Sequence, residues 1–436
     1  MQMRLAALAA WVAAVAVAWP TRAADPVPAH DPPPTRLSLD DAFARVAGNH
    51  PELRVFGARR DGLAAALDSA SLRPALIAGA TVENAFGSGD ASGVRSAEFT
   101  LTLATVLERG GKLDARRTLA QSRIDALAVA REATRLDLLA EVARRYLDVV
   151  AAQRQRAIAG FDIGQRTRTV AGARQRLIAG ASPESVVLTA QAQLAKAELD
   201  AARADQRGTA ARQHLAALWG ERAPSFDVVA ADPLRLPAIV DVAALADLLQ
   251  RTPELLQFNG EARIREARLQ LARSAANADL DWQVGVRRLQ ATDDVALIGS
   301  VSMALGARGR AQPEIRTADA ELASLGIERE AKDLSLYSTL IDAHGRYRVA
   351  ALEVTRLRDD VLPKLGRAEA AAERAYRAGA ISYLEWAQLQ SERTLTRKQQ
   401  LEVALDAQRA LIEIQRLTGQ AFVAGAVTTA PQDTTP

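Results

Sequence analysis

The residue types that most often carry chemistry are sparse in this chain and form no recognisable catalytic set. The 436 residues contain no cysteine, which excludes thiol catalysis and thiolate metal ligands. Histidine pairs that bind zinc usually have about three to five residues between them. None of the four histidines is spaced in this way: His30, His50, His214 and His344. Because no nucleophile elbow, phosphate loop or paired-carboxylate motif is present either, the sequence predicts no catalytic residue, no bound metal and no cofactor.

Two short segments could still meet charged ligands. Arg109-Gly110-Gly111-Lys112 has the composition of a phosphate-binding turn, but it lacks a second motif and lies between a predicted strand and a predicted helix. We interpret it as a turn at the edge of a membrane. Glu385 has two interpretations. It fits a helix capping box with Ser382, and as a carboxylate at the narrow end of a pore it would bind or select cations.

These residues belong to a chain that repeats its own order. Asn49-His50-Pro51-Glu52-Leu53 returns as Arg251-Thr252-Pro253-Glu254-Leu255, and Leu218-Trp219-Gly220 returns as Leu417-Thr418-Gly419. The period is far longer than the roughly 20–50 residues of a solenoid repeat. The sequence therefore predicts a duplicated half-molecule. The expected halves are residues 37–222 and 239–420, joined by a proline-containing linker at 223–238.

Each half contains two segments in which polarity alternates with a period of two, as in a half-buried strand. Phe99, Leu101 and Leu103 would face one side, with Thr100 and Thr102 on the other. Strands of about nine to eleven residues cross a bilayer when tilted, and such faces fit a wall between lipid and water, although an ordinary hairpin shows the same pattern. The expected strands are about 76–86, 97–105, 280–290 and 295–305.

A very long helix is expected after each pair of strands, at about 113–179 and 314–377, the second interrupted only near Pro363. At 1.5 Å per residue the first would span about 100 Å. No globular core accommodates such a helix, so it must pack along a tube or rod, and its apolar stripe indicates coiled-coil packing. Return helices are expected at about 183–219 and 383–418.

Tight turns join the long helices to the return helices. Gly180 and Gly379 stand where a left-handed residue usually ends a helix. Ser182 and Ser382 are expected to cap the return helices, with Pro183 at the first helical position. Both halves would thus end in helical hairpins about 100 Å from the strands.

The ends of the chain indicate export. Residues 1–23 have a basic start and an apolar run from Leu5 to Ala18, too short for a transmembrane helix, with cleavage expected after Ala23. A proline-rich arm follows at 24–36, and a flexible tail is expected at 421–436. The net charge is +3 with acids and bases interleaved, so no nucleic-acid partner is predicted.

Together these features resemble the TolC family of outer-membrane efflux proteins. The resemblance covers residues 37–420 and rests on the duplicated halves, the segment 49–53, the turn Glu108-Arg109-Gly110-Gly111-Lys112, and the two glycine turns followed by serine. The Gly-Gly-Lys turn and the tip at 179–183 are most similar to the branch that exports heavy metals such as cobalt, zinc and cadmium.

The resemblance implies a mostly α-helical protein with a membrane β-barrel part, in the outer membrane of a Gram-negative bacterium. Four transmembrane strands per chain cannot close a barrel, so a homotrimer would supply twelve, surrounded by outer-membrane lipid and continued by a coiled-coil tunnel through the periplasm. The chain would be a passive, gated exit duct for an inner-membrane RND-type pump. A periplasmic adaptor (membrane fusion) protein would dock at the helical tips: Gly180, Ala181, Ser182, Gly379, Ala380 and Ser382.

The resemblance also implies a periplasmic gate formed by acidic residues just after the second tip. Glu385 matches the first of these positions, whereas Gln388 stands where a second acid often lies. That difference lowers the negative charge expected at the gate and weakens the prediction of a strong cation site.

Three alternatives remain open from the sequence. The same channel could carry drugs or a protein substrate of type I secretion, because the conduit meets its cargo after the pump has selected it. A periplasmic coiled-coil adaptor would share the export signal and the helical hairpins but would not need strand pairs of membrane-crossing length. A periplasmic enzyme is disfavoured because no catalytic set is present.

Overall fold

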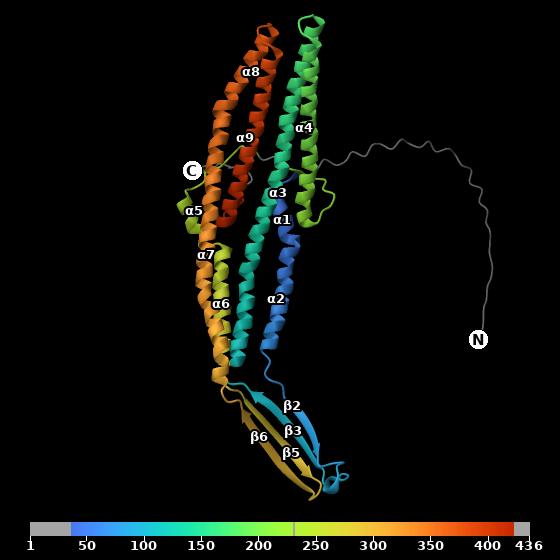
Figure 1. The fold of residues 1–436 in the computed structure, drawn as a ribbon, viewed down its shortest axis with the longest axis vertical. Helices are drawn as coiled ribbons and strands as arrows, with labels where there is room; N and C mark the ends of the chain where they lie inside the picture. The colour runs from blue at the N-terminus through green and yellow to red at the C-terminus, as the bar shows by residue number, and fades with distance from the viewer. Residues whose placement is uncertain (1–35, 230–231, 423–436) are drawn as a thin grey trace, which may run out of the picture.

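A computed structural model describes residues 36–229 and 232–422 and shows an elongated molecule built from two similar halves (Figure 1). The predicted signal peptide with its cleavage site at Ala23, the predicted arm up to residue 35 and the predicted tail from residue 423 lie outside the described residues. In the first half the elements are β1 (Arg36–Leu37), α1 (Leu39–Asn49), α2 (Pro51–Ala70), β2 (Ile77–Glu83), the 3₁₀ turn η1 (Gly89–Ala91), β3 (Glu98–Leu107), α3 (Lys112–Ile178), α4 (Glu184–Ala216) and the 3₁₀ turn η2 (Ala217–Trp219).

The second half repeats this order with one additional break. Its elements are α5 (Val242–Leu249), α6 (Pro253–Ser274), β5 (Leu280–Leu289), β6 (Asp294–Met303), α7 (Ala307–Arg356), the π-helical segment η3 (Leu357–Val361), α8 (Leu362–Arg377) and α9 (Tyr383–Thr418). Within the part of the chain that the structure describes, no helix has the length and apolar character needed to cross a membrane.

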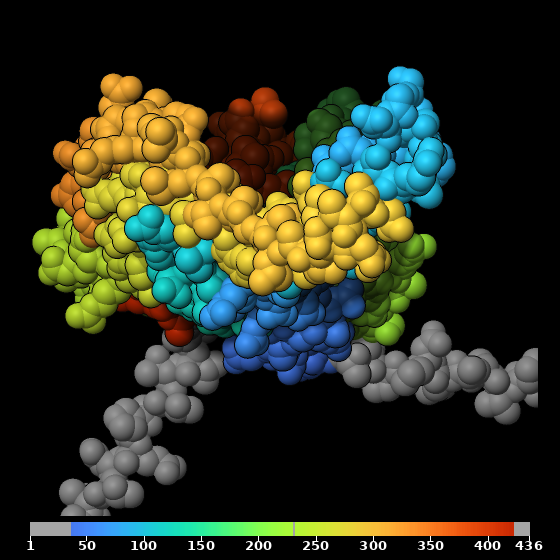
Figure 2. Space-filling model, turned by 90° about the horizontal axis from the view of Figure 1, so that it is seen from below, coloured from blue at the N-terminus to red at the C-terminus, as the bar shows by residue number. Residues whose placement is uncertain are grey.

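The four long strands form one antiparallel sheet at one end of the molecule, in the order β2-β3-β5-β6 (Figure 1). The register pairs Leu101 with Val286 and Leu103 with Val284, so their side chains share one face. Thr100 pairs with Arg287 on the other face. Seen from this end, β5 and β6 (yellow) lie between the orange α7 and the light-blue loop after β2 (Figure 2). The sheet thus has an apolar face and a polar face.

Helices continue the sheet as a rod. Next to the strands the order is α2, α3, α6 and α7, because α3 contacts both α2 and α6, and α6 contacts α7. At the far end α3 pairs with α4, and α8 pairs with α9, as two hairpins (Figure 1). The 67-residue α3 runs through both regions, about 100 Å at 1.5 Å per residue. It therefore links the sheet to the hairpin tips within one rigid element.

The segment predicted as a linker contributes to the core midway along the rod. It contains β4 (Asp227–Val228), which pairs in parallel with β1. Phe226 and Val228 are buried there. The hydroxyl of Tyr146 on α3 lies 2.9 Å from the Val229 carbonyl oxygen and 3.2 Å from that of Leu37, and burial raises the pKa of Tyr146 to about 12. These contacts fasten the linker to the long helix.

The second long helix differs from the single helix expected from residue 314. It begins at Ala307, and Pro313 lies inside α7. A proline there removes one hydrogen bond, to the carbonyl of Gly309. Both residues are exposed, so water can satisfy that carbonyl. Near Pro363 the helix widens into the π segment, where the Leu362 N–H donates to the Leu357 carbonyl five residues earlier. The wider turn accommodates the proline without ending the helix.

Candidate functional site

The two helical tips have the same backbone geometry. Gly180 and Gly379 adopt φ of +67° and +78°. In the first tip the Ala181 N–H donates to the Arg176 carbonyl at 2.8 Å and the Gly180 N–H to the Leu177 carbonyl at 2.9 Å. Ala380 and Gly379 make the equivalent pair of bonds in the second tip, at 2.8 and 3.0 Å. These are Schellman motifs, which reverse the chain in a fixed direction.

The return helices begin differently in the two halves, and the prediction for Ser182 and Pro183 is wrong. Ser382 caps α9, but Pro183 occupies the cap position of α4, which begins at Glu184. Each cap lies three residues after its glycine, and that spacing places Pro183, not Ser182, opposite Ser382. Proline has no side-chain acceptor, so α4 has no side-chain cap hydrogen bond within the described residues.

Glu385 closes a capping box at the start of α9. Its Oε2 accepts hydrogen bonds from the Ser382 N–H at 2.8 Å and from the Ser382 hydroxyl at 3.1 Å. The Glu385 N–H donates back to the Ser382 hydroxyl oxygen at 3.3 Å. Glu385 and Gln388 are both exposed and lie within one turn on α9. The structure therefore brings the two predicted gate residues together beside the second tip.

An aromatic cluster fixes the two hairpins to each other just behind the tips. The ring of Tyr376 stacks on Trp386 with 5.0 Å between centroids and meets Tyr383 edge-on. From the other hairpin, the Arg176 guanidinium lies 4.8 Å from the Tyr376 ring centre and donates to the Tyr376 carbonyl at 2.6 Å. Sequence reasoning missed this cluster. The only sequence signal was three aromatic residues within one short segment.

Farther from the tips, a buried polar layer lies between the hairpins. Asp162 and Arg166 on α3 form an ion pair at 3.0 Å, with both side chains only 8% exposed. The Thr394 hydroxyl on α9 donates to Asp162 at 3.1 Å. Gln165 on α3 donates to Glu369 on α8 at 2.8 Å. Buried charges are tolerated only when they are paired in this way, so the layer fixes the register of α3 against α8 and α9. No pattern in the sequence indicated this layer.

At the opposite end of α3, the Gly-Gly-Lys segment is a turn that packs against the next half. Gly110 has φ of +75°, and a Cβ added there would lie 2.3 Å from the Asn277 side-chain nitrogen. Lys112 pairs with Asp279 at 2.7 Å, and Arg116 pairs with Glu108. The turn therefore connects β3 and α3 to the α6–β5 connection.

These ion pairs lower the pKa values of the acidic groups at the turn. The hydrogen bond from Arg116 holds the pKa of Glu108 below its ordinary value. Burial acts to raise the pKa of Asp279, but hydrogen bonds from Lys112 and the Arg109 N–H outweigh it, so that pKa is also lowered. Both carboxylates are therefore ionised at neutral pH and stabilise the turn.

The polar face of the sheet carries one guanidinium that joins three strands. Arg287 on β5 donates to Glu98 at 2.8 Å and Thr100 at 3.0 Å on β3, and to Glu83 at 3.1 Å on β2. Thr100 is buried beneath it. This face is suited to water, whereas the opposite face is not.

The three histidines that lie within the described residues occupy structural positions in helices or at a helix start. The His50 Nδ1 accepts from the Glu52 N–H at 3.3 Å at the start of α2, and His344 is buried 3.3 Å from the Val240 carbonyl oxygen. His214 lies in the last turn of α4, and His30 lies outside the described residues. Among residues 36–229 and 232–422, no three histidine, aspartate or glutamate side chains are grouped to hold a metal ion.

The chain is similar to known outer-membrane proteins. A family model described as outer membrane efflux protein matches residues 44–221. The cobalt-zinc-cadmium resistance protein CzcC of Cupriavidus metallidurans is 28% identical over 317 residues, which cover 72% of this chain and 75% of that protein.

Two solved structures share the fold. CusC has a TM-score of 0.73 at 18% identity, over 88% of this chain and 92% of that chain. The outer membrane protein VceC of Vibrio cholerae has a TM-score of 0.72 at 17% identity, over 88% of this chain and 97% of that chain. At such identities the likeness is one of fold: a four-stranded sheet continued by long helices.

Proposed function

We propose that this chain, which belongs to the outer membrane efflux protein family, is the outer-membrane exit duct of a tripartite efflux system. One observation carries the proposal: the sheet exposes a whole apolar face at the end of a helical rod. On that face Leu101 is 66%, Val301 67% and Leu297 87% exposed. A monomeric soluble protein rarely exposes so large an apolar surface, whereas lipid would cover it. A periplasmic adaptor would have no use for this face.

Three copies of the chain would close the sheet into a barrel. Within the described residues, β2 and β6 are the outer strands and each pairs on one side only. Open strand edges are not tolerated in lipid, and four strands are too few to close. A homotrimer would join β6 of one copy to β2 of the next and give twelve strands. The polar face with Arg287 would then line a water-filled lumen, and α2, α3, α6 and α7 would continue the wall into the periplasm.

The tips would form the periplasmic end of this duct. They carry rigid backbone turns, at Gly180, Ala181 and Ser182 in one hairpin and at Gly379, Ala380 and Ser382 in the other, and all of these residues except the half-buried Ser182 are exposed. Such turns suit docking of a periplasmic adaptor protein, which would connect the duct to an inner-membrane pump of the RND type. The pump would supply the energy, and the duct itself would be a passive, gated conduit.

Glu385 and Gln388 would form the gate at that end. Glu385→Gln is a sharp test, because glutamine can also serve in a capping box and only the charge is removed. We expect weaker block of single-channel current by Zn²⁺ or Co²⁺. Glu184→Gln is the matched control, since Glu184 is the exposed acid in the first turn of α4. Unchanged block in the Glu385 variant would remove this residue from the gate.

We propose heavy-metal cations as the substrates, on the likeness to a cobalt-zinc-cadmium resistance protein. Growth of a deletion strain tests this across zinc, cobalt, cadmium, nickel, copper and a panel of drugs. Sensitivity to a few divalent metals, rescued by the intact gene, is expected. Sensitivity to drugs alone would assign the duct to drug efflux. A lost secreted protein with normal metal tolerance would assign it to type I secretion.

A further inference from the structure

The place where strands become helices has an unusual distribution of charge. On the apolar face, Leu107 is the last residue of β3, and Leu76 and Leu305 lie just beyond the ends of β2 and β6. The three leucines Leu76, Leu107 and Leu305 are exposed by 64%, 53% and 80%. Each continues the alternation of its strand, two residues beyond the apolar-face positions Ala78, Thr105 and Met303. The apolar face therefore reaches the junction, with one polar side chain on it, Thr105, whose hydroxyl donates to the Ala75 carbonyl at 3.1 Å.

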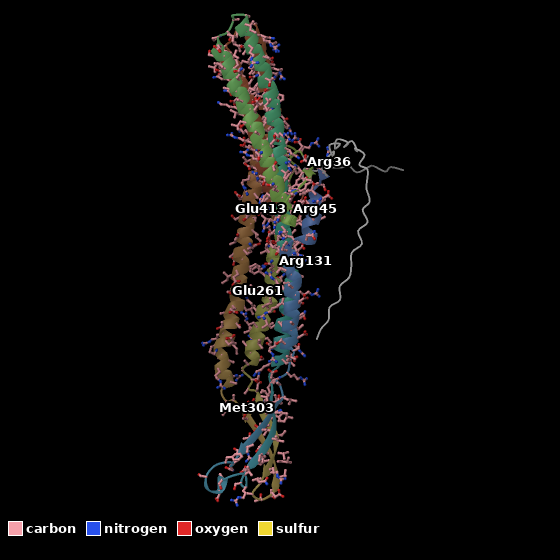
Figure 3. The ribbon with its side chains drawn as sticks, turned by 90° about the vertical axis from the view of Figure 1, so that its right-hand side faces the viewer. Arg36, Arg45, Arg131, Glu261, Met303 and Glu413 are labelled. Carbon is pink, nitrogen blue, oxygen red and sulfur yellow. The ribbon has the colours of Figure 1, made fainter. Side chains whose placement is uncertain are left out.

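Exposed arginines lie within five residues of these leucines in the sequence. Arg73 precedes Leu76, Arg109 follows Leu107, and Arg308 and Arg310 follow Leu305. The Arg109 guanidinium lies 3.9 Å from the Met303 sulfur, and Arg310 donates to the Leu305 carbonyl at 3.0 Å. Met303 is on the apolar face at the end of β6, where the rod meets the strands (Figure 3). The Arg109 guanidinium thus lies against this face, and the Arg310 guanidinium lies at the turn that follows it.

Three of the acids at the junction are neutralised by other residues, whereas Asp281, on the polar face of β5, is exposed and has no ion pair within the described residues. Glu108 pairs with Arg116, Asp279 with Lys112, and Asp114 lies 4.0 Å from Arg117. In the part of the chain that the structure describes, the four exposed arginines have no carboxylate within ion-pair distance. They are Arg73, Arg109, Arg308 and Arg310. The next acid along α7, Glu314, is one turn farther from the sheet.

The other end of the strands has the opposite balance. Two of its arginines are paired, Arg287 with Glu83 and Glu98, and Arg288 with Asp293. Arg95, in the loop between β2 and β3, is exposed and has no ion pair within the described residues. Two additional exposed acids lie there, Asp90 in the η1 turn and Asp294 at the start of β6. The excess of unpaired positive charge is therefore specific to the helix end of the sheet.

We infer that these four arginines, with the leucines beside them, form a belt that binds the headgroups of anionic phospholipids. The inference rests on the proposed function, because it needs the apolar face to lie in a bilayer. A long cationic side chain at the edge of an apolar band keeps its stem in the acyl region and its charge among phosphates. An anionic lipid surface attracts each basic residue by about 1 kcal/mol. The belt would fix the depth of the barrel and select phosphatidylglycerol for the adjoining leaflet.

The test is electron spin resonance of the purified full chain in phosphatidylcholine vesicles. Spin-labelled phosphatidylglycerol and spin-labelled phosphatidylcholine with identical acyl chains are compared as probes. We expect the protein to immobilise phosphatidylglycerol with about fivefold higher association, the factor for one guanidinium at an anionic surface. The preference should decrease at about 1 M salt, where the screening length is about 3 Å.

The variant R73Q/R109Q/R308Q/R310Q should immobilise both lipids nearly equally. R54Q/R131Q/R168Q/R348Q is the matched control, since it removes four exposed arginines along the helices, and it should keep the preference. R308Q/R310Q alone should lose part of it and serves where the quadruple variant does not fold. Equal immobilisation of the two lipids by the wild type, or an unchanged preference in both belt variants, would overturn the inference. Absence of any immobilised lipid would instead contradict the membrane barrel itself.

Discussion

Replacing Gly110 with alanine should test how the two halves meet where the strands join the helices. Gly110 and Gly111 have nearly identical backbone angles, with φ of +75° and +74°. Their surroundings differ. A Cβ on Gly110 would lie 2.3 Å from Nδ2 and 2.6 Å from Cβ of Asn277, whereas a Cβ on Gly111 would have nothing within 4 Å. Comparing alanine variants at the two positions therefore separates the cost of backbone strain from the cost of steric overlap.

The magnitudes follow from these two effects. A side chain in the left-handed region costs about 1–2 kcal/mol, and this applies to both positions. Overlap with a packed neighbour adds about 1–3 kcal/mol, and this applies to Gly110 alone. We expect Gly111→Ala to lower the free energy of unfolding by about 1–2 kcal/mol per protomer, and Gly110→Ala by about 2–5 kcal/mol.

The assay is guanidinium unfolding of the reconstituted protein, followed by the fluorescence of Trp282 on β5 in a background where Trp219 and Trp386 are replaced with phenylalanine. The midpoint should decrease while the slope stays constant. In an Asn277→Gly background the three nearest atoms are absent, so Gly110→Ala should then cost no more than Gly111→Ala. Equal losses from the two alanine variants, or a Gly110 loss that persists without the Asn277 side chain, would refute the packing of this turn on the α6–β5 connection.

Three further predictions concern the helical tips and the stability of the protein at acidic pH. Gly379→Val places a branched side chain at φ of +78°, a strain of about 1–3 kcal/mol. It should abolish the proposed metal export while the proposed trimer persists on a native gel. Gly172→Ala, at a helical glycine in open space, should leave export intact. Ser382→Ala removes a cap worth about 1 kcal/mol and should speed hydrogen exchange in the first turn of α9; unchanged exchange would contradict the capping box. The hydrogen bond from Arg116 lowers the pKa of Glu108. The resulting stability is present above the unfolded-state pKa and is lost as pH falls through the folded-state pKa. Unfolding midpoints measured from pH 7 to pH 3 should therefore decrease less in Glu108→Gln than in the wild type.

The sequence by itself determined the features that depend on neighbours within a few residues. Alternation in residues 97–105 indicated a strand with an apolar and a polar face, because successive side chains point to opposite sides. Gly180 and Gly379 indicated left-handed helix ends, because only glycine adopts that backbone without strain. Ser382 and Glu385 indicated a capping box, because both partners lie in one helical turn.

Predictions made from local spacing were wrong about where two helices begin. Ser182 was expected to cap α4 because serine is a good cap and Pro183 suits the first helical turn. In both tips, however, the cap is the third residue after the glycine, and in the first tip that residue is Pro183. Pro313 was expected to precede its helix, yet it lies inside α7, because an exposed position tolerates the lost hydrogen bond.

Tertiary structure alone decided the contacts that join distant segments. Arg176 reaches Tyr376, the polar layer places Gln165 against Glu369, and Asn277 closes over Gly110. Each pair depends on how whole helices are placed against one another, and many residues far apart in the chain contribute to that placement. The sequence could therefore indicate a duct with rigid turns at one end and membrane strands at the other. Only the packed structure shows which side chains hold its hairpins together and where its unpaired charges gather.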